Sequence, residues 1–233
     1  RFPNVEQIAC FDTAFHSALP EIVKRFPLPE KYWNGGVRRY GFHGLSFEYI
    51  MQYLGTNLPK RTIIAHLGNG SSMVALREGH PVDTTMGMTP AGGLMMGSRS
   101  GDLDPGVLVH LLREIGMSVE ALDTLVNKDS GLKGVSGLTG DMKTLLEKRS
   151  ECPSADLAIQ MYCYQARKHI GALSAVLGGL DLLVFTGGVG ENAREVRKEI
   201  LQGLDYLQCE SKTLRTDESR MIAQHVKRVT GAL

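Results

Sequence analysis

Short apolar runs separated by glycine-containing turns characterise the stretch from residue 61 to residue 85. Three runs have the length and composition of β-strands, at 61–66, 72–77 and 81–85. The turns between them are Gly68-Asn69-Gly70 and Glu78-Gly79-His80. Because turns this short join antiparallel neighbours, the pattern predicts a three-stranded antiparallel meander.

Two further apolar runs predict strands outside the meander. Residues 7–11 (QIACF) are expected to form a short buried strand that ends at the polar pair Asp12-Thr13. Residues 181–185 (DLLVF) form a continuous apolar run, which is typical of a strand buried on both faces. A glycine-rich loop and a charged helix are expected to follow it.

Helical spacing of apolar residues predicts six helices along the chain. They are expected at 45–54, 105–116, 118–127, 154–177, 193–203 and from Thr216 onward. Asp104 followed by Pro105 is a typical helix start, and Gly178-Gly179 a typical helix end. Residues 86–104 show neither the helical nor the strand periodicity of apolar residues, which predicts a long irregular loop with a functional role. Together, the predicted strands and helices indicate one α/β domain.

Composition narrows the possible function classes. The chain has 233 residues, of which 42% are hydrophobic, with 26 Lys and Arg against 25 Asp and Glu. A net charge of +1 gives no global electrostatic attraction to nucleic acid or to an anionic membrane, and no apolar run is long enough to span a bilayer. Four cysteines without metal-ligand spacing are interpreted as small buried hydrophobes in a reducing cytoplasm: Cys10, Cys152, Cys163 and Cys209.

The strongest local motif is the glycine-rich segment 185–192 (FTGGVGEN). A buried strand that breaks into glycines before a helix exposes backbone N–H groups to an anionic or planar ligand. The segment has neither the Gly-Lys-Ser/Thr of a P-loop nor the spacing of a dinucleotide-binding loop. The alternative interpretation is a tight strand–helix turn without a ligand.

Two other loops are candidate phosphate sites. In segment 66–72 (HLGNGSS), the Asn between two glycines is also the usual hairpin signal, and the hairpin alone explains it. Arg99 stands between glycines before a helix start, and its guanidinium fork can bridge two phosphoryl oxygens. The alternative for Arg99 is an ion pair with Asp102 or Asp104, although Asp104 is expected to serve as the helix cap.

Three further residues are weaker candidates. His43 in segment 40–44 (YGFHG) can contact an anion, but lone histidines are often packed structural residues. Asp12 and Glu218 could hold Mg²⁺, which in phosphoryl transfer usually takes one or two carboxylates. Asp12 could equally be a turn residue, and Glu218 an acid favoured in the first turn of a helix.

Together these segments resemble the acetate kinase family, carboxylate phosphotransferases of the actin, sugar kinase and Hsp70 superfamily. The matching segments are FDTAFH (11–16), YGFHG (40–44), HLGNGSS (66–72), DTTMGMTP (83–90), MGSRSGDLDPG (96–106), FTGGVGEN (185–192) and TDESRMIA (216–223). They occur in the family's order. The resemblance implies a ribonuclease H-like α/β fold.

The same resemblance implies an activity and a site. It implies reversible Mg²⁺-dependent transfer of the ATP γ-phosphoryl group to acetate, directly and in line, giving acetyl phosphate and ADP. Arg99, His43 and Asp12 would be catalytic, Asp12 and Glu218 would hold the metal, and Phe42, Pro90 and Asn69 would bind substrate. Nucleotide would bind at His66, Gly68, Asn69, Gly70, Asp141, Met142, Lys143, Gly187, Gly188, Val189, Gly190 and Asn192. A loose phosphoryl transition state needs such positioning and charge neutralisation rather than a nucleophilic side chain.

Departures from the family pattern leave alternatives open. Ala91-Gly92 replaces a Leu-Glu pair in the loop over the acyl pocket, which leaves propionate or butyrate as alternative substrates. Met142 and Lys143 replace an aromatic residue and an Arg near the adenine. An alternative outside the enzymes is a non-catalytic module that binds nucleotide without turnover.

The resemblance covers the C-terminal part of the family's length. Residues 1–233 are therefore expected to be the C-terminal nucleotide- and substrate-binding domain of a two-domain kinase whose N-terminal domain is absent. Residues 1–20 would connect the domains, and residues 217–233 would begin the return to the other domain. The complete enzyme is expected to be a cytoplasmic homodimer, and this chain alone to be nearly inactive.

Overall fold

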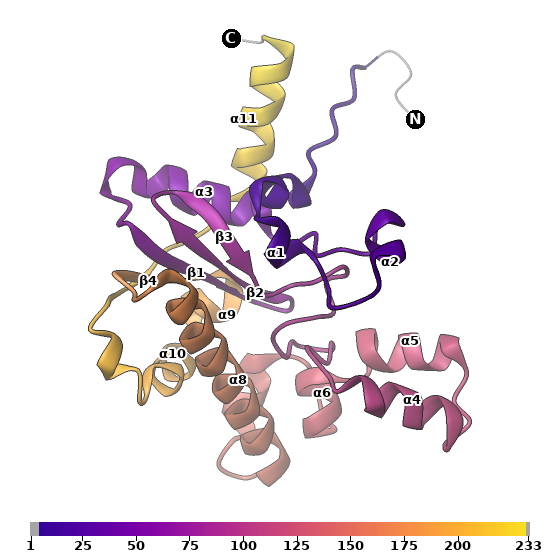
Figure 1. Ribbon diagram of the computed structural model, residues 1–233. Coiled ribbons are helices and arrows are strands. Elements are labelled where there is room, and N and C mark those ends of the chain that lie inside the picture. Colours follow the sequence, from indigo (N-terminus) through magenta and orange to yellow (C-terminus); the bar gives the residue numbers. More distant parts are fainter. Residues whose placement is uncertain (1–4, 232–233) are drawn as a thin grey trace.

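A five-stranded mixed sheet forms the centre of the molecule (Figure 1). The computed structural model describes residues 5–231, so the outermost residues of the expected connecting segments 1–20 and 217–233 lie outside it. Its strands are β1 (Arg61–Leu67), β2 (Ser71–Arg77), β3 (His80–Thr84), β4 (Leu182–Thr186) and β5 (Glu210–Thr213). Their order is β3-β2-β1-β4-β5. The first three strands are antiparallel, which confirms the predicted meander, while β4 runs parallel to both β1 and β5.

Helices cover both faces of this sheet, and alternation along β1 decides which residues meet them. Ile63 and Ala65 face a cluster that includes the long helix α8 (Pro153–Leu177). Ile64 lies on the opposite face and packs with α3 (Gly44–Leu54). β4 is buried along its whole length and is apolar except for Thr186, as the sequence predicts, whereas in β1 the buried apolar residues are Ile63, Ile64, Ala65 and Leu67.

The remaining helices surround this three-layer core. They are α1 (Glu21–Lys24), α2 (Glu30–Asn34), α4 (Pro105–Arg113), α5 (Val119–Lys128), α6 (Gly131–Ser136), α7 (Met142–Lys148), α9 (Gly187–Asn192), α10 (Arg194–Leu201) and α11 (Glu218–Thr230), with short 3-10 helices at Asp12–Ala18, Gly55–Asn57 and Asp205–Leu207. The predicted caps of two helices are confirmed. The Asp104 carboxylate accepts a hydrogen bond from the Gly106 N–H at 2.8 Å, and Gly178 ends α8 with φ +74°.

Three predicted elements are wrong. Residues 7–11 form no strand, because among the described residues no strand lies beside them, and Phe11 is 71% exposed. The expected glycine loop after β4 is instead the helix α9, since only its first residue, Gly187, has a positive φ. Thr216 does not cap α11; the Asp217 side chain accepts the hydrogen bond from the Arg220 N–H.

Other elements have weak sequence patterns or unexpected burial. The edge strand β5 (ESKT) is polar and mostly exposed, so it has no apolar period to detect. The apolar face predicted for α4 is not buried, and the α4–α5 pair projects from the body of the molecule (Figure 1). Of the four cysteines only Cys163 is buried, and all four are free thiols.

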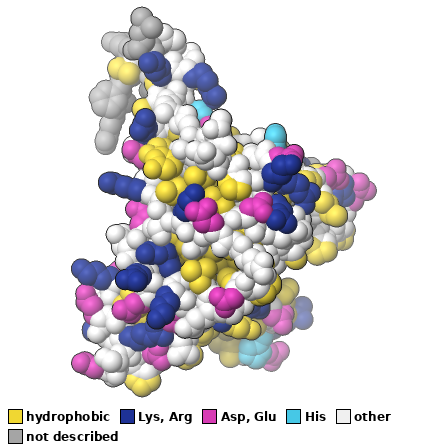
Figure 2. Space-filling model, turned by 90° about the vertical axis from the view of Figure 1, so that its left-hand side faces the viewer, with side chains coloured by type: hydrophobic (Ala, Val, Ile, Leu, Met, Phe, Trp, Pro, Cys, Tyr) yellow, Lys and Arg dark blue, Asp and Glu magenta, His cyan; other side chains and the backbone are white. Residues whose placement is uncertain are grey.

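The surface bears charges of both signs. On the face shown in Figure 2, Lys and Arg are interspersed with Asp and Glu, in line with the net charge of +1. Among the described residues, no helix is both long and apolar enough to cross a membrane.

Candidate functional site

Two histidines stack where β1 and β2 meet α3. The rings of His43 and His66 are parallel, with 4.2 Å between their centroids. The His43 Nδ1 shares a hydrogen bond with the Ser72 Oγ, and the His66 Nδ1 with the Ser46 Oγ, each at 2.8 Å. These two serine bonds fix both rings, and within residues 5–231 neither Nε2 has a hydrogen-bond partner.

Both histidines are held neutral. Burial and then the positive charge of Arg99 lower the pKa of His43 to about 4. Burial and then His43 lower the pKa of His66 to about 3. At neutral pH the pair therefore offers neutral hydrogen-bonding groups rather than charges.

Arg99 joins these rings at the Gly70 turn. A Cβ placed on Gly70 would lie 3.2 Å from the His43 Nε2 and 3.4 Å from the Arg99 Nη1. Glycine at this position therefore leaves a small space between the histidine and the guanidinium. We call His43, His66 and Arg99 the histidine–arginine cluster.

The guanidinium of Arg99 is available for a ligand. Its Nη1 donates to the Pro90 carbonyl at 3.3 Å, and within residues 5–231 it forms no ion pair. The alternative ion pairs are absent because Asp102 accepts from the Gly93 N–H at 2.7 Å and Asp104 caps α4. A cation without a carboxylate partner beside a small space suits an incoming anion.

The irregular segment 86–104 brings Arg99 to the hairpin turn through close backbone contacts. The Gly97 N–H donates to the Asn69 carbonyl at 3.1 Å. A Cβ on Gly97 would lie 2.5 Å from the Asn69 Oδ1, so this approach requires glycine. The turn Gly68-Asn69-Gly70, which we call the GNG turn, therefore has two roles. It closes the hairpin between β1 and β2, and it holds the loop that carries Arg99.

The predicted pocket residues Phe42 and Pro90 lie beside the cluster. Phe42 precedes His43, which has the left-handed φ of +57°. Pro90 contacts Arg99, and the segments that carry Phe42 and Pro90 are tied by the bond from the Tyr40 N–H to the Gly87 carbonyl at 3.0 Å. A substrate held by these two residues would lie next to the guanidinium.

Asp12 has a structural task that sequence reasoning missed. Its carboxylate accepts from the backbone N–H of His43 and from that of Leu45, the latter at 3.0 Å. It therefore caps the start of α3 from a distant segment and fixes the backbone of His43.

Glu218, the first residue of α11, lies within electrostatic reach of Asp12. Burial, and then the charge of Asp12, raises the pKa of Glu218. No group of three or more metal-ligating residues occurs among the described residues. Two neighbouring carboxylates nevertheless fit Mg²⁺, which takes oxygen ligands and usually completes its shell with phosphates and waters.

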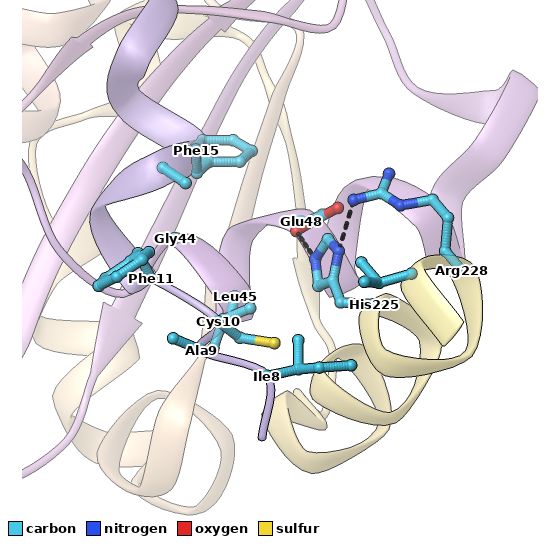
Figure 3. A pocket seen from close by; sticks show the side chains of 12 residues that line it. Ile8, Ala9, Cys10, Phe11, Phe15, Gly44, Leu45, Glu48, His225 and Arg228 are labelled. Carbon is cyan, nitrogen blue, oxygen red and sulfur yellow. Dashed lines mark hydrogen bonds and ion pairs between the residues drawn. The ribbon is translucent and has the colours of Figure 1, made fainter. Parts of the chain in front are cut away.

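Side-chain bonds fasten helix α11 to α3, as Figure 3 shows. His225 Nε2 and Glu48 Oε2 are 2.8 Å apart, and the Arg228 Nη2 donates to the His225 Nδ1 at 2.8 Å. These bonds border a cavity of about 200 Å³ between α3, α11 and residues 8–11. Glu218 on α11 and Asp12 at the start of the 3-10 helix Asp12–Ala18 thus belong to two elements that both pack against α3.

A cavity of about 700 Å³ lies between the GNG turn, α7 and α9, and we call it the α7–α9 cavity. It is lined by eight of the twelve residues predicted to bind nucleotide: Gly68, Asn69, Asp141, Met142, Lys143, Gly188, Val189 and Asn192. Leu146, Glu147 and Ala193 also line it and were missed, although 146 and 147 follow 142 and 143 at helical spacing. Residues from three distant segments therefore share one hollow.

The other four predicted nucleotide residues lie outside this lining. His66 and Gly70 belong to the neighbouring cluster. The Gly187 N–H already donates to Glu191 Oε1 at 3.2 Å, and Gly190 is buried, with room for a Cβ 3.5 Å from the Phe185 carbonyl carbon. Glu191 also accepts from the Thr216 N–H at 3.1 Å, so it joins α9 to the segment before α11.

Known proteins resemble this chain over most of its length. Residues 1–230 match the model of the Acetokinase family. Acetate kinases of Methylocella silvestris and of a Sulfurovum species are 43% and 48% identical over 96% and 88% of this chain. The chain spans 61% and 53% of the lengths of these two relatives.

Solved structures also resemble this chain over most of its length. The acetate kinase of Porphyromonas gingivalis superposes with a TM-score of 0.92 at 37% identity, covering 98% of this chain and 65% of that one. A propionate kinase of Francisella tularensis gives 0.89 at 35% identity, covering 96% and 64%. These likenesses confirm the α/β fold inferred from the sequence motifs. The chain belongs to the acetokinase family.

Proposed function

We propose that this chain is the nucleotide- and phosphoryl-binding part of an acetate kinase. The reaction is reversible transfer of the ATP γ-phosphoryl group to acetate, directly and in line, giving acetyl phosphate and ADP. The observation that carries this proposal is the unpaired guanidinium of Arg99, which lies at the GNG turn beside the α7–α9 cavity.

Each group has a role that its environment supports. Arg99 stabilises the charge of the transferring phosphoryl group, and neutral His43 donates a hydrogen bond to that group. His66, Asn69 and the glycines of the turn hold phosphate oxygens, while Phe42 and Pro90 contain the acetate methyl group. The α7–α9 cavity takes the nucleoside, with Asp141 and Lys143 near the ribose and base.

Mg²⁺ would be held by Glu218 and Asp12, and when bound it neutralises phosphate charge. Both carboxylates belong to elements that pack against α3, and the charge of Asp12 acts on Glu218. Because both Asp12 oxygens accept backbone hydrogen bonds, a role through metal-bound water is compatible with its capping task. Ser98 and Ser100 donate to backbone carbonyls, so we assign no phosphoenzyme to either.

We also propose the setting of this chain. It acts as the C-terminal domain of a two-domain enzyme, with residues 1–20 connecting the domains and residues 217–233 leading back. The complete enzyme would be a cytoplasmic homodimer acting on acetate. The 61% and 53% spans of the relatives' lengths support a larger catalytic unit.

The decisive experiment separates nucleotide binding from transfer. Titration of the 233-residue chain with ATP and Mg²⁺ is expected to show one site, and Gly188→Leu should abolish binding by filling the cavity. An added side chain at Gly188 meets nothing within 4 Å at its Cβ, so the variant should fold. Unchanged binding in Gly188→Leu would remove the α7–α9 cavity as the nucleotide site.

Transfer is then measured as acetyl hydroxamate, with acetate, propionate and butyrate compared by kcat/KM in a full-length enzyme that contains this domain. We expect acetate to be preferred and the isolated chain to show only trace activity. A preference for butyrate would overturn the assignment of acetate. Robust activity of the isolated chain would overturn the two-domain proposal.

A further inference from the structure

Thr216 connects parts of the proposed site that are distant in sequence. It lies two residues before Glu218, in the segment that leads into α11. Its N–H donates to Glu191 Oε1 on α9 at 3.1 Å, and its Oγ1 accepts from the Ser46 hydroxyl on α3 at 2.9 Å. Three elements therefore meet at one residue that has no role in the proposed transfer reaction.

The bond between Ser46 and Thr216 decides where the ring proton of His66 lies. A serine hydroxyl has one proton to donate. Ser46 donates it to Thr216 Oγ1, and Thr216 directs its own hydroxyl proton to the Ser46 carbonyl at 3.5 Å. The Ser46 Oγ then accepts from His66 Nδ1, 2.8 Å away, so Nδ1 carries the proton. Because burial lowers the pKa of His66 to about 3, the ring is neutral at pH 7 and its Nε2 has a free lone pair.

His43 has the opposite arrangement. Its Nδ1 is 2.8 Å from the Ser72 Oγ, and within residues 5–231 the Ser72 hydroxyl has no other hydrogen-bond partner. The Ser72 hydroxyl therefore donates to Nδ1, which leaves the proton of neutral His43 on Nε2, beside Arg99. The two stacked rings thus present different groups, a donor at His43 and an acceptor at His66.

The Nε2 of His66 is open to a ligand. In the described part of the chain, the buried side-chain nitrogens without a partner are His16 Nδ1 and Arg38 Nε, so the unpaired His66 Nε2 is not sealed inside the protein. A Cβ on Gly187 would lie 3.1 Å from it, and one on Gly68 would lie 3.7 Å from it. Gly68 also lines the α7–α9 cavity, so this nitrogen lies where that cavity meets the histidine–arginine cluster.

We propose that Thr216 is a positioning residue that keeps His66 in the tautomer with a bare Nε2, so that His66 accepts a hydrogen bond from a water molecule at the phosphates. The role of this water rests on the proposed function, whereas the tautomer is a property of the chain alone. Ionised phosphate oxygens are acceptors, so they avoid a bare nitrogen and bond to His43 and Arg99 instead. His66 then holds a phosphate oxygen only through the bridging water, which donates one proton to each. The two histidines thereby direct the terminal phosphate toward the guanidinium.

Nitrogen-15 NMR of the 233-residue chain at pH 7, without ligand, tests the tautomers. Protonated and bare imidazole nitrogens have well-separated chemical shifts, and His66→Gln and His43→Gln identify the signals of each ring. We expect the proton of His66 on Nδ1 and that of His43 on Nε2. A proton on Nε2 of His66, or the same tautomer in both rings, would overturn the proposal.

Substitutions at Thr216 test its role as the positioning residue. Thr216→Val keeps the shape of the side chain but removes the acceptor for Ser46, so the Ser46 hydroxyl should donate to His66 Nδ1 and the ring proton should move to Nε2. Thr216→Ser keeps the hydroxyl and should retain the original tautomer. Thr213→Val, at an exposed threonine of β5, is the matched control. If Thr216→Val fails to fold, Thr216→Ala removes the same acceptor, and an unchanged tautomer in the folded variant would overturn the role of Thr216.

Kinetics of a full-length enzyme that contains this domain test the role of the water. In Thr216→Val the Nε2–H of His66 would bond a phosphate oxygen directly and draw it away from Arg99. We expect kcat to fall by about 10-fold without a rise in the KM for ATP, and Thr216→Ser to retain kcat. A raised KM with unchanged kcat would overturn the role in phosphate positioning.

The proposed function and this inference can fail separately, because the tautomers are measured without nucleotide. A chain that shows the expected tautomers but does not bind ATP would refute the proposed function. A chain that binds ATP but keeps the tautomer of His66 in Thr216→Val would refute this inference.

Discussion

The histidine–arginine cluster and the α7–α9 cavity are neighbours that are built in different ways. In the cluster, side chains define the geometry, since two serine bonds and an aspartate cap hold the histidines. In the cavity, helix ends and backbone at Gly68 and Gly188 form much of the wall. Substitutions in the cluster should therefore affect chemistry, whereas substitutions in the cavity should affect shape and stability.

The largest expected effect is that of Arg99→Ala in a full-length enzyme. Loss of a cation that acts on the transition state should lower kcat by about 10³-fold. Nucleotide affinity of the 233-residue chain, measured by titration, should change little because Arg99 does not line the α7–α9 cavity. Arg113→Ala is the control, and an effect mainly on KM would reassign Arg99 to substrate binding.

The two glycines at the start of α9 test how the backbone of the cavity wall is built. Substitutions at Gly187 and Gly188 should change the free energy of unfolding by different amounts. Gly187 has φ +78°, and a Cβ there would lie 2.8 Å from the Leu67 carbonyl. Gly187→Ala should lower the free energy of unfolding by roughly 2 kcal/mol. Gly188→Ala meets nothing within 4 Å and should change it by less than about 0.5 kcal/mol. Urea unfolding of both variants measures the difference, and equal effects would contradict it.

Local patterns predicted the parts of the fold that depend on local chemistry. The meander followed from short turns, and α4 followed from Asp104 and Pro105. The region 7–11 was misassigned because an apolar run alone does not supply a neighbouring strand. The helix α9 was missed because three glycines within six residues oppose helix propensity, while packing against β1 and β4 overrides it.

Site residues were identified more fully than their contacts. The motif resemblance indicated His43, His66 and Arg99, which the fold brings together. Ser46, Ser72 and the cap by Asp12 depend on contacts 20 to 31 residues apart in sequence, which no local spacing encodes. Tertiary pairing therefore has to be seen in the structure.

The cluster should also make the fold acid-sensitive in a way that the cavity does not. Unfolded histidine binds protons below about pH 6.5, whereas folded His43 and His66 have pKa values near 4 and 3. The unfolded state binds more protons in this window, so the stability present above pH 6.5 is lost as the pH falls toward 4.

His66→Gln should remove the proton that the unfolded chain takes up at residue 66. The free energy of unfolding should then depend less steeply on pH between 6 and 5. The expected change in slope is roughly 1 kcal/mol per pH unit. His110→Gln, at an exposed histidine of α4, is the control and should leave the slope unchanged. Identical slopes for all three proteins in urea unfolding would show that His66 is not held neutral.

Asp141 should give the smallest effect and also tests what the wall of the cavity requires. Its carboxylate caps α7 by accepting from the N–H groups of Lys143 and Thr144, at 3.3 and 3.2 Å. Asp141→Asn keeps an acceptor at this position, whereas Asp141→Ala removes the cap and should cost about 1 kcal/mol of stability.

If Asp141 acts only by shaping the cavity, Asp141→Asn should retain nucleotide affinity, and Asp141→Ala should lose affinity only as far as α7 frays. If its charge contacts the nucleotide, Asn should weaken binding without changing the unfolding free energy. Titration and urea unfolding of the two variants separate a wall built by helix ends from one built by side-chain contacts.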